Sequence, residues 1–147
     1  MRLNFEQLGQ VVGHIDAGTM SDTDTLLSAG VDRNDYTQIV LVLDLGAMGG
    51  ALNCQLLTSA TNSGYAAASP STEIVIPDTG DNSTYVVRWD LKNATQLNKF
   101  VQVEIEADGG SVVVAGAMVF LFGPGDTNDI PAANATYVYN GNEAAAS

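Results

Sequence analysis

The sequence has few of the side chains that form covalent cross-links or reaction centres. Its 147 residues include one cysteine, Cys54, one histidine, His14, and one tryptophan, Trp89. A single cysteine forms no internal disulfide, which excludes the disulfide-framed secreted modules. A single histidine excludes metal sites built on two histidines. No serine lies in a G-x-S-x-G motif, which excludes the hydrolases that carry this nucleophile elbow.

Basic residues are also scarce. The chain has 5 lysines and arginines against 17 aspartates and glutamates, for a net charge of −12. Nucleic-acid binding requires cations that displace counterions from phosphates, and five scattered cations form no basic stripe. We therefore expect no nucleic-acid partner and no binding to anionic membranes. The cations are Arg2, Arg33, Arg88, Lys92 and Lys99.

Long hydrophobic runs are absent. The longest, Val112–Phe122, contains Gly116 and is shorter than the roughly 20 residues of a membrane span. The first 18 residues lack the apolar core of a signal peptide. We therefore expect no membrane segment and no targeting signal, with synthesis in the cytoplasm.

What the sequence does contain is a series of short β-type runs. Valine, isoleucine, threonine and aromatic residues alternate with polar ones, and clusters of Gly, Asn, Asp, Ser and Pro separate the runs. Seven or eight strands at this spacing predict an all-β fold, an antiparallel β-sandwich that is jelly-roll-like, with extended N- and C-terminal arms. The expected strands cover residues 38–46, 51–58, 73–76, 83–91, 99–107 and 111–122, with weaker candidates at 11–15, 26–29 and 136–139.

One domain is expected from a length near 150 residues. We assign residues 1–123 to the β-sandwich, with 1–18 as a candidate N-terminal arm, and residues 124–147 to a C-terminal tail or arm. The tail has no cation and is rich in Ala, Asn, Gly and Asp. These features are typical of a segment that lies outside a packed core.

Two expectations concern the apolar run near residue 115. The sequence Asp108-Gly109-Gly110 predicts a hairpin turn, so residues 99–107 and 111–122 are expected to pair. The second of these strands is almost continuously apolar. We therefore expect both of its faces to be covered.

No reaction centre emerges from the candidate side chains. Cys54 alternates with Leu52 and Leu56, which predicts a buried thiol that behaves as a small hydrophobe. No cation beside it would lower its pKa. His14 is expected as an ordinary histidine in a loop or at a strand end. We therefore predict no catalytic residue and no enzymatic activity.

Oxygen-rich clusters raise the question of calcium. Ca²⁺ needs six to eight oxygens, and each cluster supplies two or three. Asp and Asn also begin turns without binding any ion. We expect no metal and no cofactor, with structural calcium as the alternative. The clusters are Asp22 with Asp24, Asp78 with Asp81 and Asn82, and Asp126 with Asn128 and Asp129.

Aromatic residues are candidates for a sugar-binding platform. Tyr85 and Trp89 alternate with apolar residues, so we expect them in the core. Tyr65 lies in a polar loop, and Tyr137 and Tyr139 lie in the tail. These three are the candidates for exposed contacts.

The order of the segments resembles that of small structural proteins of tailed bacteriophages. A short strand and a V-D-x-x-x-Y turn lead into a hydrophobic strand that ends in D-x-G, and a Ser-rich loop then ends in an aromatic residue. The resemblance covers about residues 26–124, and it departs from the pattern at Gln102, where Arg is expected. The residues that carry it are Val31, Asp32, Tyr36, Asp44, Gly46, Gln55, Leu56, Ser59, Asn62, Gly64 and Tyr65, followed by residues 98–103 and the AGAMVFLFGP strand.

This resemblance implies a virion component, most specifically a capsid decoration or cement protein on the outer surface of the head, with a minor head or tail protein as the alternative. Its implied partners are the major capsid protein and other copies of itself, as a homotrimer. Residues 1–18 and the tail after Pro124 are then expected to make most contacts between subunits. The alternative is a carbohydrate-binding β-sandwich module of a phage tail or surface layer.

Overall fold

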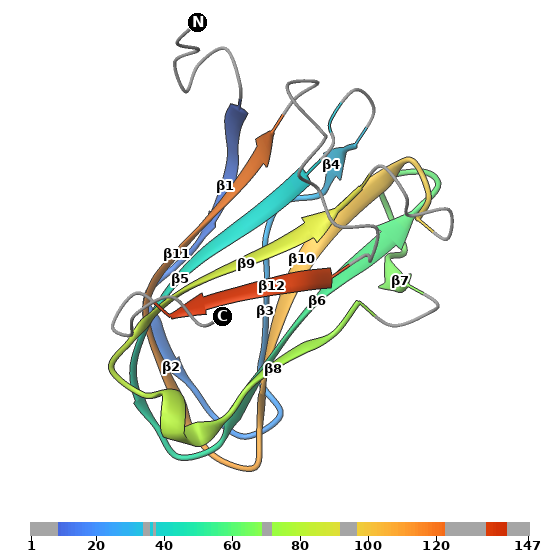
Figure 1. The fold of residues 1–147 in the computed structure, drawn as a ribbon. Coiled ribbons are helices and arrows are strands. Elements are labelled where there is room, and N and C mark those ends of the chain that lie inside the picture. Colours follow the sequence, from blue (N-terminus) through green and yellow to red (C-terminus); the bar gives the residue numbers. More distant parts are fainter. Residues whose placement is uncertain are drawn as a thin grey trace, which may run out of the picture.

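The computed structural model describes residues 9–33, 36, 38–68, 72–91, 97–122 and 135–140. Two antiparallel sheets pack face to face, with sheet A in front of sheet B in Figure 1. This arrangement confirms the predicted all-β antiparallel sandwich. Within the described ranges, no helix is long and apolar enough to cross a membrane.

Sheet A contains the two strands nearest the ends of the chain. Its order is β1 (Gly9–Ile15), β11 (Val112–Phe122), β5 (Gln38–Met48), β9 (Thr84–Asp90) and β12 (Ala135–Asn140), and β2 (Gly18–Met20) pairs with the other end of β11.

Sheet B is built on two long central strands. Its order is β3 (Thr25–Leu27), β10 (Phe100–Asp108), β6 (Ala51–Ser59) and β7 (Ala66–Ala67), with β4 (Val31–Asp32) also on β10 and β8 (Ile74–Ile76) also on β6. A single 3₁₀ turn, η1 (Asp78–Gly80), precedes β9.

The core lies between the two sheets and follows the alternation of the sequence. In β10, Val101, Val103 and Ile105 are fully buried, whereas the residues between them are half-exposed. Trp89 is also fully buried, and its indole Nε1 donates a 2.8 Å hydrogen bond to the Thr72 carbonyl. The prediction that the Trp89 face of β9 points inward is confirmed.

The predicted hairpin at residues 108–110 is wrong. β10 belongs to sheet B and β11 to sheet A, so this turn carries the chain from one sheet to the other. The Gly49-Gly50 turn makes the reverse crossing between β5 and β6, at the same lower end in Figure 1. The two turns touch, because a Cβ placed on Gly50 would overlap the Gly110 nitrogen. A Gly-Gly turn is compatible with either connection, so the local sequence does not distinguish them.

The expectation that both faces of β11 are covered is also wrong. Val119 and Leu121 are buried, but Met118 is 45% exposed and Phe120 and Phe122 are only half-buried. In a two-layer sandwich, each sheet packs only one face against the other. The outer face of β11 therefore remains accessible although its residues are apolar.

The described residues form twelve strands, where seven or eight were expected. The additional strands include β2, β4 and β7, which have two or three residues each. Segments this short show no measurable alternation, so a periodicity argument does not detect them.

Both predicted arms include strands of sheet A. β1 pairs with β11, and β12 pairs antiparallel with β9, with Val138 opposite Val87. The strand expected at residues 136–139 is therefore present. Residues 1–8, 123–134 and 141–147 lie outside the described residues, so the division into sandwich and arms stays a prediction.

Candidate functional site

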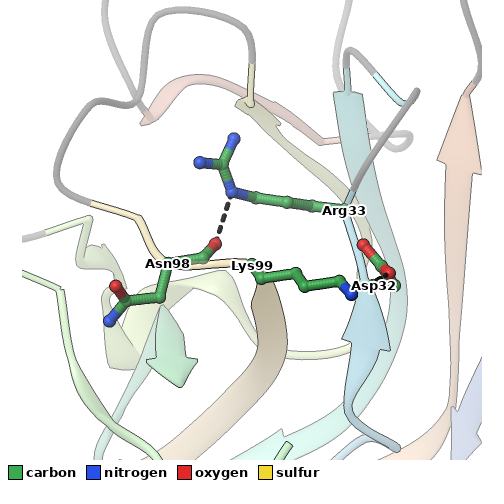
Figure 2. A network of polar contacts seen from close by, with 4 residues as sticks. All are labelled: Asp32, Arg33, Asn98 and Lys99. Atoms are coloured by element: carbon green, nitrogen blue, oxygen red, sulfur yellow. Dashed lines mark hydrogen bonds and ion pairs between the residues drawn. The ribbon is translucent and has the colours of Figure 1, made fainter. Parts of the chain in front are cut away.

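Arg33 holds the connection between β9 and β10 in place. It follows β4 directly, and its guanidinium donates three hydrogen bonds to main-chain carbonyls of that connection. Nε donates to the Asn98 carbonyl at 2.5 Å, as Figure 2 shows. Nη2 donates to the Leu97 carbonyl at 2.7 Å and Nη1 to the Leu91 carbonyl at 3.2 Å. The Arg33 backbone nitrogen also donates to the Lys99 carbonyl at 3.0 Å. One side chain thus fixes both ends of a long crossover.

Lys99 brings a second cation to the same place. Its Nζ lies 3.5 Å from Asp32 Oδ2 (Figure 2). The same Nζ lies 5.3 Å from the centre of the Phe100 ring. Both charged side chains are well exposed, so this pair contributes little to stability. No carboxylate of the described residues pairs with Arg33, so the group Arg33, Lys99 and Asp32 carries an excess of one positive charge.

A solvent-open hollow of about 320 Å³ lies between these groups. It is lined by Arg33, Leu97, Asn98 and Lys99. Sequence reasoning treated the cations as scattered and missed this site. No local signal could have revealed it, because pairing of β4 with β10 is what brings residues 33 and 99 together.

A second hollow, of about 240 Å³, lies on the outer face of sheet A. Its lining is almost entirely apolar and comes from the facing parts of β5 and β11, where Met118 lies opposite Val42. Asp44 stands at its border and accepts a 3.3 Å hydrogen bond from the Thr84 hydroxyl. This hollow is part of the accessible face of β11 that the sequence predicted to be covered.

The two central strands of sheet B carry polar side chains on their outer face, whereas Leu27 and Val75 on the flanking strands are exposed hydrophobic residues. Gln55 Nε2 donates to Glu104 Oε1 across β6 and β10 at 2.6 Å, and Gln102 Nε2 donates to the Ser28 carbonyl at 2.7 Å. Asn53, next to Glu106 in the register, has a side-chain oxygen that is buried without a hydrogen-bond partner. Half-buried amide and carboxylate groups therefore form a strip across the two central strands.

His14 and Cys54, the candidate base and nucleophile, do not line either hollow. His14 is in β1 with its side chain 73% exposed, and its Nε2 lies 3.0 Å from Asp16 Oδ1. Cys54 is fully buried. Burial, with a smaller contribution from Glu73, raises the pKa of the Cys54 thiol to about 12. The thiol therefore stays protonated at neutral pH, as expected of a small hydrophobe.

The aspartate clusters serve the turns in which they lie. Asp22 Oδ1 accepts a 2.8 Å hydrogen bond from the Gly109 nitrogen, and Asp24 Oδ2 accepts one of 2.7 Å from the Ser21 nitrogen. Asp81 contacts the amide of its neighbour Asn82 at 3.3 Å. Across the described part of the chain, no group of three or more His, Cys, Asp or Glu side chains is placed to hold a metal ion. The cluster at residues 126–129 lies outside the described residues.

The candidate sugar-binding aromatics differ in their surroundings. Tyr85 is buried, and its hydroxyl donates a 3.0 Å hydrogen bond to the Gly80 carbonyl. Tyr65 is half-exposed, and its hydroxyl donates to Asn62 Oδ1 at 2.5 Å. Partial burial raises the pKa of Tyr65. A Cβ on Gly30 would overlap the Tyr65 hydroxyl, so the hydroxyl end of this ring packs against Gly30. The side chains at residues 137 and 139 lie outside the described ones.

No protein-family model and no curated protein matches this chain. Among solved structures, it is similar to a carbohydrate-binding module, CBM28, specific for non-crystalline cellulose, with 15% identity and a TM-score of 0.47 over 75% of this chain and 80% of that one. It is also similar to a chain of infectious bursal disease virus, strain Gx, with 12% identity and a TM-score of 0.45 over 88% and 35% of the two chains. A third similar structure is a Podospora anserina GH26-CBM35 β-(1,4)-mannanase, with 14% identity and a TM-score of 0.39 over 84% and 29%. At these values the similarities carry no argument about function.

Proposed function

We propose that this chain is a non-enzymatic structural protein of a virion, a capsid decoration or cement protein that bridges major capsid subunits on the outer surface of the head. The observation that carries the proposal is that the two terminal strands, β1 and β12, lie at opposite edges of the same sheet. An edge strand exposes unpaired backbone groups to which another chain can add a strand. The segment order that resembles tailed-phage structural proteins supports the virion location.

The length of the chain before β12 supports exchange of this strand between copies. Gln38 pairs with Phe122 and with Asp90, and Trp89 pairs with Ala135. The end of β11 and the start of β12 are therefore separated by three strand spacings, about 15 Å. Residues 123–134, when extended, span on the order of 40 Å. This length is sufficient for β12 to pair with β9 of a neighbouring copy, as in a cyclic homotrimer.

Co-sedimentation tests the proposed function. Purified protein is added to heads of the phage that encodes it, assembled without it. We expect saturable binding at a fixed ratio to the major capsid protein. Absence of binding to heads under conditions where the protein is folded would contradict the decoration role.

Deletion of residues 126–147 tests the role of the C-terminal segment. We expect lower occupancy on heads, because the deletion removes the strand available for exchange. Circular dichroism of the deleted chain is the control, since β12 also completes an edge of sheet A. A folded variant with unchanged occupancy would exclude the tail as a bridging element.

The second candidate is carbohydrate binding by the outer face of sheet B. The observation that favours it is the polar strip, in which Asn53 has an unpartnered carbonyl oxygen beside Gln55 and Glu104. Amide and carboxylate groups form hydrogen bonds with sugar hydroxyls. A glycan-binding screen with and without a chelator tests this candidate, and Gln55→Ala should then abolish any binding.

A further inference from the structure

We propose that the hollow lined by Arg33, Leu97, Asn98 and Lys99 is a carboxylate-binding site that receives an aspartate or glutamate side chain of a second copy of this chain. The inference rests on the self-association included in the proposed function and identifies one of its contacts. It does not depend on attachment to a capsid.

The guanidinium of Arg33 is held ready for such a ligand. Its hydrogen bonds to three carbonyls use three of its five N–H groups, which leaves two. Because these bonds fix the side chain, binding a further acceptor costs little conformational entropy. The guanidinium fork matches the geometry of a carboxylate.

The charge around the hollow is unbalanced. Asp32 offsets one cation through Lys99, and no carboxylate of the described residues pairs with Arg33. Main-chain carbonyls satisfy hydrogen bonds but carry no net charge. Among the described residues, these side chains therefore leave a local positive excess on a protein with a net charge of −12.

The size of the hollow fits a side chain. Its volume of about 320 Å³ is roughly ten times the volume that one water molecule occupies in the liquid. This volume is large enough for a carboxylate and its methylene groups. Leu97 and Asn98 complete the lining beside the two cations.

Charge complementarity identifies a second copy as the occupant. Each copy carries 17 acidic residues and a net charge of −12, so two copies repel each other overall. The cationic hollow of one copy attracts the acidic side chains of another, so it favours one orientation of approach. The acidic side chains of one copy and the hollow of the next are thus the two halves of one contact between copies.

Carbodiimide cross-linking tests the inference directly. The reagent joins a lysine amine to a carboxyl group in contact with it, forming an amide with loss of water. Unlabelled and isotope-labelled chains are mixed, cross-linked and digested. We expect mass spectrometry to find Lys99 joined to an Asp or Glu of a differently labelled copy. If Lys99 is joined only to carboxyls of its own copy, such as Asp32, the inference is wrong.

Analytical ultracentrifugation of the full chain supplies the second measurement. Lys99→Gln should raise the dissociation constant for self-association about tenfold, and added salt should have a similar effect. Thr19→Glu is the matched control, because Thr19 is exposed on sheet A and this substitution also lowers the net charge by one unit. Equal effects of the two variants, or a wild-type chain that stays monomeric at every concentration, would overturn the inference. Head binding is measured separately, so a cement protein with another self-contact would still be recognised.

Discussion

Gly50 and Gly110 lie against each other where the chain crosses twice between the two sheets. A Cβ on Gly50 would overlap the Gly110 nitrogen and lie 2.6 Å from the Asp108 carbonyl oxygen, and both of these atoms belong to the backbone. Backbone atoms cannot move aside as the end of a side chain can. The absence of a side chain at both positions is therefore what allows this end of the sandwich to close.

Gly50→Ala should destabilise the protein by about 3 kcal/mol, because the added methyl group forces the two turns apart. Chemical denaturation measures this difference. Gly18→Ala is the control, since nothing lies within 4 Å of the position that its Cβ would take, and it should change stability by less than about 0.5 kcal/mol. Equal effects of both substitutions would show that the turns do not pack as described.

Arg33→Lys should destabilise the protein by about 2 kcal/mol. Lysine keeps the charge but has one nitrogen, so it cannot bond to the Leu91, Leu97 and Asn98 carbonyls together. Thermal unfolding measures the loss. Lys99→Gln serves as the comparison, because its exposed ion pair is worth about 1 kcal/mol or less. If Arg33→Lys leaves the stability unchanged, the three hydrogen bonds of the Arg33 side chain are not needed for folding.

The buried thiol of Cys54 should make stability depend on alkaline pH. Its pKa is about 12 in the native protein against an ordinary value of 9.0, so the native state keeps a proton that the unfolded chain loses. Unfolding then releases a proton between pH 9 and about 12, and the free energy of unfolding falls as the pH rises. Urea denaturation across this range measures the decline.

Cys54→Ala separates this effect from the titration of tyrosines and lysines, which both proteins share. The variant should show a smaller decline over the same pH window. Identical slopes for the two proteins would contradict burial of the thiol. Below pH 9 the thiol of the native wild-type protein should also resist alkylation.

Thr72 satisfies a backbone group of β6 between the segments that pair with β7 and with β8. β7 pairs at Leu57 and β8 pairs up to Cys54, and between them the Leu56 nitrogen donates a 2.8 Å hydrogen bond to Thr72 Oγ1. Thr72→Val should cost about 1–3 kcal/mol, because it leaves this buried N–H group without its acceptor. Hydrogen exchange should show faster exchange of the Leu56 amide. Thr72→Ser keeps the hydroxyl and should lose much less stability than Thr72→Val.

The strands themselves were largely predictable from the sequence. Alternation placed Val103 and Trp89 inside and marked β5, β6, β9, β10 and β11 to within a few residues. This works because side chains alternate between the two faces of a strand, so the sequence records burial residue by residue. It also identified Cys54 as a buried apolar group.

The partners of those strands were decided only by the tertiary structure. The Gly109-Gly110 turn fits a hairpin and a crossing between sheets equally well, and the crossing follows from the pairing of β10 with β6 and of β11 with β5. The hollow beside Arg33 arises because β4 pairs with a strand far along the chain. Local composition determines which residues avoid water. Which distant segments meet depends on how two sheets fill a common core, and this decided where the few cations of the chain come together.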